Sequence, residues 1–211
     1  MKNIVVLVSG GGTNLQALID AQQRGEIHGG EISCVISSKE GAFALERAKK
    51  AGIRTRVLAR KNFPDNLTYS DALLTFLREE SADLIVLAGF MVILDEMLIH
   101  AYENCILNVH PSLIPSFCGD GFYGLHVHEA ALKKGVKVTG ATVHLVNEIC
   151  DGGPIVLQKA VAVEEGDTPE TLQRRVMEQA EWHILPQAVD LFCQERLDIR
   201  DGVVHIIDQM D

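Results

Sequence analysis

The chain has 211 residues, of which 47% are hydrophobic and 23% charged, and its formal net charge is −10. This length suits one domain and supplies enough apolar material for a large core. The acidic balance argues against a broad nucleic-acid-binding surface. The longest apolar runs, IVVLV and LIVLAGFMVIL, are too short and too interrupted to span a bilayer, and no signal-peptide pattern follows the first residue. Five cysteines, an odd number without a C-x-x-C pair, indicate reduced thiols in a cytoplasmic protein.

The first half of the chain alternates short apolar runs with helical patterns. The strands expected from these runs lie at 4–8, 32–37, 55–59, 83–88 and 105–110. The helices expected between them lie at 14–24, 42–51, 67–79 and 95–102. Strand–helix–strand alternation predicts a parallel sheet with right-handed crossovers.

The second half has a different pattern. Long β runs at 136–146 and 154–163 are joined by the turn-forming NEICDGG, which predicts an antiparallel extension of the sheet. The motif DTP, an N-cap residue followed by proline, begins a helix that we expect to reach Cys193 with a kink at Pro186. The tail LDIRDGVVHII predicts two short strands around a turn. No linker or repeat interrupts the chain, so we expect one α/β domain over 1–211.

A glycine-rich turn, SGGGTNL, follows the first expected strand and leads into a helix. The backbone N–H groups of such a turn and the helix dipole favour a bound anion. The turn is not a dinucleotide-binding motif, because Leu15 stands at its third glycine position and no acidic residue ends the second strand. It is not a Walker loop either. We therefore expect Gly12, Thr13 and Asn14 to hold a single phosphate, and a purely structural tight turn is the alternative.

Asn108 and His110 lie two residues apart in LNVHPSLIP, where Pro111 stops a strand. Side chains at i and i+2 of a strand point to one face, so the amide and the imidazole arrive together. This pair suggests an oxyanion donor beside a proton-transfer group, whereas the alternative is a polar strand end that caps local backbone. The later motif DGGP, which begins at Asp151, is by itself more typical of a turn than of a catalytic site.

Taken together, SGGGTN, AGFMVIL, NVHPSLIP, GATVHLV and DGGPIVLQ resemble the folate-dependent formyltransferases, nearly end to end and in the family's order. The resemblance implies a Rossmann-like formyltransferase fold, a mostly parallel twisted sheet flanked by helices with an antiparallel C-terminal extension. It implies a phosphate-binding half at 1–110 and a folate-binding and C-terminal half at 111–211. The chain is most similar to the branch that transfers the formyl group of 10-formyltetrahydrofolate to the amine of 5'-phosphoribosylglycinamide in de novo purine biosynthesis.

The resemblance also implies roles for individual residues. Asn108 would donate a hydrogen bond to the tetrahedral oxyanion, His110 would donate a proton, and Asp151 would raise the pKa of His110 and position a proton-shuttling water. The ribonucleotide would be bound by Gly12, Thr13, Asn14, Glu178, Gln179, Ala180 and Glu181, with Glu181 as its main helix contact. The folate would be bound by Met91, Val92, Ile93, Leu94, Asn108, Asn147, Glu148, Ile149, Cys150 and Asp151.

The chain departs from the family pattern at two positions that often carry arginine. One position holds Val92, where a backbone contact would survive the change. The other holds Asn66, which affects the expected contact with the folate glutamate tail; Arg60 or Lys61 could substitute. The segment 116–128 is longer than in compact members of the family, and its glycine and aspartate residues predict a mobile loop.

Several alternatives remain open from the sequence. His126 and His128 could be imagined as metal ligands with Cys118, but the spacing matches no zinc pattern and the pair would diverge in a helix, so we expect no metal. His144 either assists the site or is a satisfied core histidine. The expected partners are the small molecules phosphoribosylglycinamide and folate, without nucleic acid or membrane, and the protein is a monomer or a homodimer. The alternative functions are hydrolysis of formyltetrahydrofolate and a non-catalytic phosphate-binding module.

Overall fold

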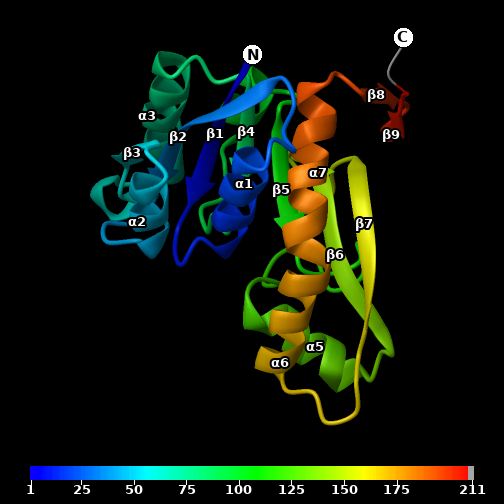
Figure 1. The fold of residues 1–211 in the computed structure, drawn as a ribbon. Helices are drawn as coiled ribbons and strands as arrows, with labels where there is room; N and C mark the ends of the chain where they lie inside the picture. Colours follow the sequence, from blue (N-terminus) through cyan, green and yellow to red (C-terminus); the bar gives the residue numbers. More distant parts are fainter. Residues whose placement is uncertain (209–211) are drawn as a thin grey trace.

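A seven-stranded sheet forms the centre of the protein in the computed structural model, which describes residues 1–208 (Figure 1). The strands are β1 Lys2–Val8, β2 Gly30–Ser37, β3 Arg54–Val57, β4 Leu84–Leu87, β5 Ile106–His110, β6 Val138–Leu145 and β7 Ile155–Ala162. Their order across the sheet is β3-β2-β1-β4-β5-β6-β7. The first five strands pair in parallel, and β6 and β7 pair antiparallel. The expected parallel sheet with an antiparallel extension is therefore confirmed.

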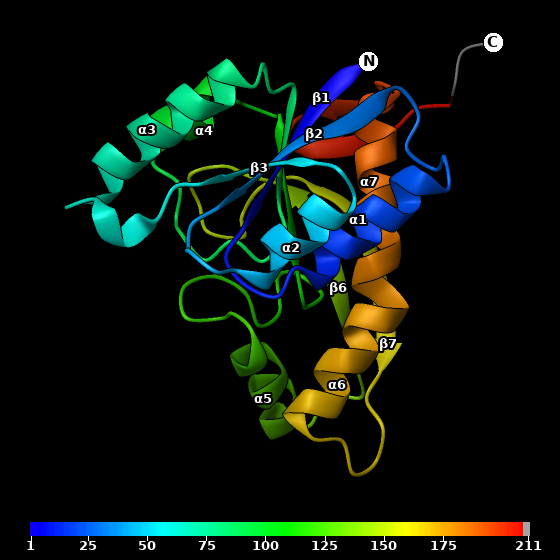
Figure 2. The ribbon, with the colours of Figure 1, turned by 60° about the vertical axis from the view of Figure 1, so that its left-hand side comes forward.

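Helices cover both faces of the sheet, as Figure 2 shows, with α3 and α4 on one side and α1, α2 and α7 on the other. The helices are α1 Thr13–Gln23, α2 Phe43–Lys50, α3 Asn66–Glu79, α4 Glu96–Ala101, α5 Leu125–Lys134, α6 Pro169–Val176 and α7 Trp182–Cys193, with a 3-10 turn at Arg60–Asn62. A separate hairpin consists of β8 Leu197–Arg200 and β9 Val203–Ile206. Over residues 1–208, no helix combines the length and the apolar character needed to cross a membrane.

The first strand shows why a continuous apolar run was needed. Ile4, Val6 and Val8 pack into the core beneath α1, α2 and α7, whereas Val5 and Leu7 pack into the core beneath α3 and α4. All five side chains are fully buried. A strand covered on both faces cannot alternate apolar and polar residues, which is why β1 is a continuous apolar run. The glycine turn that follows it consequently lies at the carboxyl edge of the parallel strands.

The last long helix contains an irregularity that the sequence did not predict. α6 and α7 are separated by a π turn at Met177–Glu181, and Pro186 lies inside α7. Proline lacks the N–H that would bond the carbonyl of Trp182, so the missing bond comes directly after the π turn. The irregularity therefore spans the predicted ribonucleotide-binding residues, and π turns are frequent at functional sites.

The segment 116–128 is only partly a loop. α5 begins at Leu125, so the expectation of a loop is wrong for the last four residues, and residues 116–124 form the connection. His126 is exposed and lies 3.1 Å from Glu129, while His128 is fully buried. The two histidines therefore diverge, as expected for helical residues.

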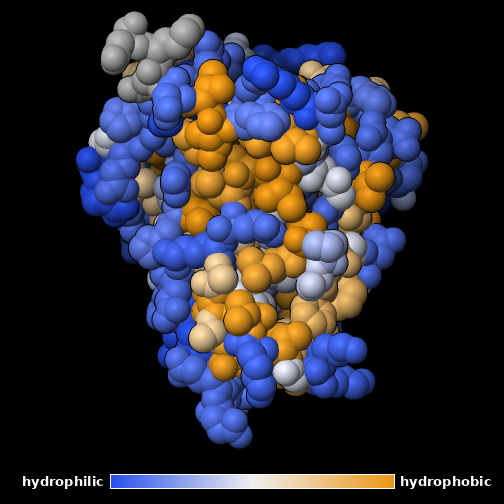
Figure 3. All heavy atoms as spheres, turned by 90° about the vertical axis from the view of Figure 1, so that its right-hand side faces the viewer, coloured by the Kyte–Doolittle hydropathy of each residue, from blue (hydrophilic) through white to orange (hydrophobic). Residues whose placement is uncertain are grey.

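The opposite edge of the sheet is formed by β7 and is open to solvent. Figure 3 views the molecule from this side and shows apolar side chains exposed on it. The exposed large apolar residues of β6, β7 and β9 are Val138, Ile155, Val203 and Ile206. β7 begins at Ile155, which pairs with His144 of β6, so one end of this edge lies next to the carboxyl end of β5.

Candidate active site

Two neighbouring strands bring an amide and two histidines together. Asn108 and His110 lie on β5, and Asn108 is directly opposite His144 of β6 in the antiparallel register. The Nδ2 atom of Asn108 lies 3.1 Å from Nε2 of His144. Nδ1 of His144 lies 2.8 Å from the carbonyl oxygen of Leu145 and donates to it, so Nε2 is the ring atom that accepts from Asn108. His144 is therefore part of the site.

Asp151 completes this cluster from the turn between β6 and β7, where it adopts a positive φ of 54°. Its Oδ2 atom lies 3.4 Å from Nδ1 of His110, and its Oδ1 atom lies 3.5 Å from both Nε2 of His144 and Nδ2 of Asn108. The backbone N–H of Gly119 donates to Oδ2 at 2.9 Å. The three predicted catalytic residues thus converge around one carboxylate, although 43 positions separate Asn108 from Asp151.

Burial and charge act in opposite directions on the two ionisable groups that were predicted to be catalytic. Burial lowers the pKa of His110, and it outweighs the Asp151 charge and the hydrogen bond to Phe117, which both raise it. The implied role of Asp151 in raising this pKa is thus present as a contribution, but the net shift is downward because His110 is only 4% exposed. Burial also raises the pKa of Asp151, but the contact with His144, the hydrogen bond from the Gly119 N–H and the charge of His110 bring it below its ordinary value. The carboxylate is therefore ionised at neutral pH.

The glycine turn is packed closely against α2 and leads directly into α1. α1 begins at Thr13, and the cap residue Gly12 has φ 73° and ψ 36°. A Cβ atom at Gly12 would lie 2.6 Å from Cβ of Ala44, so this position has room for glycine alone. Arg47 Nε donates to the carbonyl oxygen of Gly11 at 2.9 Å. The first N–H groups of a helix have no intrahelical partner, so this arrangement can bind an anion at the start of α1.

The π turn places Glu181 against the glycine turn. Asn14 Nδ2 donates to Oε2 of Glu181 at 2.7 Å, and Glu181 is 5% exposed. Burial raises the pKa of Glu181 to about 7, although the bond from Asn14 acts to lower it. Glu178 and Gln179 are exposed, whereas Ala180 is buried. Of the four predicted helix residues, Glu181 is therefore the one in contact with the predicted phosphate loop.

A surface cavity of about 310 Å³ lies beside the glycine turn. Thr13 lines it from α1, Arg47 from α2, and Glu178 and Trp182 from the π turn and α7. Thr13 also donates to the sulfur of Met177 at 3.7 Å. The cavity therefore adjoins the predicted ribonucleotide residues at Thr13 and Glu178, whereas Asn14, Glu181 and the Asn108–His110–Asp151 cluster lie outside its lining.

The predicted folate segment, Met91 to Leu94, is fixed by two side chains from elsewhere in the chain. The N–H of Met91 donates to Oγ of Ser9 at 2.9 Å. Nδ2 of Asn66 donates to the carbonyl oxygen of Ile93 at 2.7 Å. Asn66, where the family resemblance led us to expect an arginine, therefore contacts the predicted folate segment directly. The side chain of Ile93 is 71% exposed and that of Ile149, in the second predicted folate loop, 68%.

Sequence reasoning missed the loop groups that complete the site. The carbonyl oxygen of Phe117 lies 2.8 Å from Nε2 of His110, and Gly119 donates to Asp151. These are backbone groups, so no residue type marks them in the sequence. The role of His144 depends on the register between β5 and β6, which no spacing reveals. Within residues 1–208, no group of three His, Cys, Asp or Glu side chains has a metal-binding arrangement.

Known proteins resemble this chain in both sequence and structure. The formyl transferase family model matches residues 2–189. Phosphoribosylglycinamide formyltransferase from Haemophilus influenzae is 43% identical over 206 residues, which cover 98% of this chain and 94% of the relative. The crystal structure of glycinamide ribonucleotide transformylase 1 from Symbiobacterium toebii has a TM-score of 0.92 at 43% identity, and the match covers 99% of this chain and 95% of the other. A formyltetrahydrofolate deformylase from Pseudomonas syringae has a TM-score of 0.88 at 26% identity, and the match covers 98% of this chain and 66% of the other. With these matches, the chain belongs to the formyl transferase family.

Proposed function

We propose that this enzyme transfers the formyl group of 10-formyltetrahydrofolate to the amine of 5'-phosphoribosylglycinamide, a step of de novo purine biosynthesis. The observation that carries the proposal is the convergence of Asn108 and His110 on Asp151, whose carboxylate oxygens lie 3.5 Å from Nδ2 of Asn108 and 3.4 Å from Nδ1 of His110. Membership of the formyl transferase family and the anion-binding start of α1 support it. The folate is a co-substrate, and the proposed compartment is the cytoplasm.

The chemistry assigns a separate task to each group. The substrate amine attacks the formyl carbon, and the carbonyl oxygen gains negative charge in the tetrahedral intermediate. Asn108 stabilises that oxygen by donating a hydrogen bond from its side-chain amide. The contact of this amide with Asp151 is long at 3.5 Å, so one of its N–H groups can turn towards the new charge. His110 protonates the departing folate nitrogen, while Asp151 stabilises the imidazolium and accepts, through a water, the proton lost by the attacking amine.

Each of the two substrates is assigned its own set of binding residues. We assign the ribonucleotide phosphate to the N–H groups of Gly12, Thr13 and Asn14, and Glu181 supplies a further contact. We assign the pterin to the segment at 91–94 and to the loop at 147–151, whose exposed apolar side chains provide a surface for a flat ring.

The test is an absorbance assay of folate deformylation with purified, chelator-treated protein. The complete reaction contains 10-formyl folate and glycinamide ribonucleotide, and a matched reaction contains the dephosphorylated riboside. Deformylation that requires the phosphorylated acceptor and persists after chelation supports the proposal. The same rate without any acceptor would identify a hydrolase instead. No turnover with the ribonucleotide still bound would indicate a binding module and make Asn66 the first position to examine.

A further inference from the structure

Two cysteines flank the hydrogen bond that joins two loops of the site. Gly119, in the connection 116–124, donates its N–H to Oδ2 of Asp151 at 2.9 Å. Cys118 directly precedes the first of these residues and Cys150 directly precedes the second. Cys150 is exposed and Cys118 partly exposed, and both carry free thiols. The two thiols therefore lie on facing loops that are already in contact.

Electrostatic coupling agrees with this placement. Burial raises the pKa of Cys150, and the charges of Asp151, Asp120 and Cys118 raise it further. Burial and the charge of Asp151 likewise raise the pKa of Cys118. The same carboxylate thus acts on both thiols, and Cys118 acts on Cys150 directly. Because the thiolate is the reactive form, these shifts slow any reaction at neutral pH and favour it in alkaline solution.

The two loops differ in how freely their backbones can adjust. A Cβ atom at Gly153 would lie 1.8 Å from the carbonyl oxygen of Leu145, and one at Gly152 would lie 2.5 Å from Cγ2 of Ile149, so the Asp151 turn is tightly packed. Gly119 and Gly121, by contrast, have positive φ and open space where a side chain would be. A disulfide requires Cα atoms within about 7 Å. Of the two loops, the one that carries Cys118 is therefore the one with room to adjust its backbone when a bridge forms.

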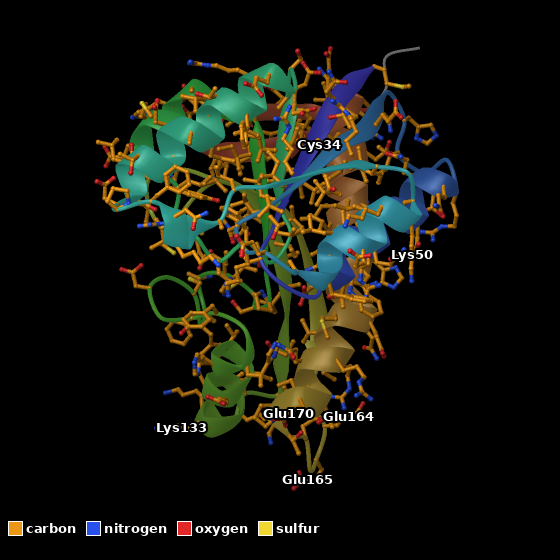
Figure 4. The ribbon with its side chains drawn as sticks, turned by 90° about the vertical axis from the view of Figure 1, so that its left-hand side faces the viewer. Cys34, Lys50, Lys133, Glu164, Glu165 and Glu170 are labelled. Atoms are coloured by element: carbon orange, nitrogen blue, oxygen red, sulfur yellow. The ribbon has the colours of Figure 1, made fainter. Side chains whose placement is uncertain are left out.

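The other cysteines provide an internal comparison. Cys34 lies on β2 (Figure 4) and is fully buried, and Cys193 is 6% exposed on α7. Burial is the largest cause that raises the pKa of each of these two thiols, to about 11. Cys105 is partly exposed but precedes β5 at the amino end of the strand, away from the site. Selective oxidation is thus expected at Cys118 and Cys150.

We propose that Cys118 and Cys150 form a redox pair, and that a low-molecular-weight disulfide oxidises them to a bridge beside Asp151. The thiolate of Cys150, the more exposed residue, attacks one sulfur of the small disulfide and releases one small thiolate. The thiolate of Cys118 then attacks the sulfur of Cys150 in this mixed disulfide and releases the second small thiol. The protein thiols lose two electrons and two protons, and the small disulfide is reduced to two thiols.

The bridge changes what the loop can do at the site. Phe117 accepts from Nε2 of His110 at 2.8 Å, and Gly119 donates to Asp151, so the loop backbone engages both proton-transfer groups. A covalent bond between the loops holds these contacts closed while substrate and product must pass. We expect oxidation to lower turnover at least about tenfold, since loop opening is needed in each cycle. This consequence rests on the proposed function, whereas formation of the bridge does not.

The experiment treats reduced, full-length protein with oxidised glutathione at mildly alkaline pH and measures intact mass, non-reduced peptide maps and formyl transfer. The variants are Cys118→Ser, which removes one partner, and Cys105→Ser, which removes a partly exposed thiol outside the site. Wild type and Cys105→Ser should lose about 2 Da with a Cys118–Cys150 cross-linked peptide. Their turnover should fall and recover with dithiothreitol, whereas Cys118→Ser should gain a glutathione adduct at Cys150 and no bridge.

The mass measurement decides the redox pair even if the protein catalyses a different reaction. Wild-type protein that carries only glutathione adducts, only links between chains, or unmodified thiols at both positions would overturn the proposal. A bridge that forms without any change in turnover would refute the role assigned to loop opening. Absence of formyl transfer in the reduced protein would count against the proposed function instead.

Discussion

The substitution Glu181→Gln should remove a pH dependence of stability that comes from one buried carboxyl. In the folded chain burial raises the pKa of Glu181 to about 7, compared with an ordinary value of 4.5. The folded state therefore retains the proton after the unfolded state has lost it, and stability falls as pH rises through this interval. The interval corresponds to about 3 kcal/mol of unfolding free energy, which is fully present below pH 4.5 and lost by about pH 7. A glutamine keeps the acceptor for Asn14 and has no proton to lose.

The assay is urea unfolding of both proteins at several pH values between about 4 and 8, with the difference in unfolding free energy as the readout. Other groups that titrate in this range are shared by the two proteins and cancel in the difference. Glu178→Gln is the matched control, because it neutralises an exposed carboxylate of the same π turn. The difference for Glu181→Gln should change by about 3 kcal/mol across the range, and that for the control should stay flat. A flat difference for Glu181→Gln would show that this carboxyl is not held neutral by burial.

Three further substitutions test the site and its support. Asp151→Asn should lower turnover by roughly 10²- to 10⁴-fold and leave ribonucleotide binding nearly intact. The control Asp190→Asn alters another aspartate, 3.0 Å from a histidine, and should leave turnover unchanged. Equal kinetics in both variants would contradict the mechanism. Gly153→Ala should destabilise the fold by roughly 1–3 kcal/mol in urea unfolding, because the new Cβ would meet the Leu145 carbonyl. Tyr69→Phe should leave the melting temperature unchanged or raise it, because the buried hydroxyl has no partner among the described residues; a clear drop would reveal a missed partner.

The sheet was predictable where the physical cause is local. β1 and β4 are buried on both faces, so their sequences are continuous apolar runs. The helices between them have apolar residues at helical spacing. The antiparallel extension followed from two long β runs joined by a short turn. The order of the strands was not predictable, because crossover rules fix the handedness of each connection and leave the neighbours open. The π turn at Met177–Glu181 was missed because its sequence has no feature as visible as Pro186.

The residues of the candidate site could be named from the sequence, but their arrangement in space could not. Asn108 and His110 share a strand, so their common face follows from the period of two. The approach of Asp151 depends on a tertiary turn, and the family resemblance supplied it in place of a physical argument. His144 could be placed in a strand, but its contact with Asn108 depends on the register. The downward pKa shift of His110 needed the burial of the whole site, which no local pattern gives.

We expect one half of the candidate site to be rigid and the other half to be adjustable, for a physical reason. The rigid half holds the charge: Asp151 lies in a turn whose glycines leave no room for side chains, so its carboxylate is aimed before substrate arrives. The adjustable half consists of loop backbone, since Phe117 and Gly119 contact His110 and Asp151 through main-chain groups. Stabilisation of a developing charge requires fixed dipoles, whereas exchange of substrates requires movement. Stiffening the second half should therefore slow product release, and loosening the first should slow the formyl transfer step itself.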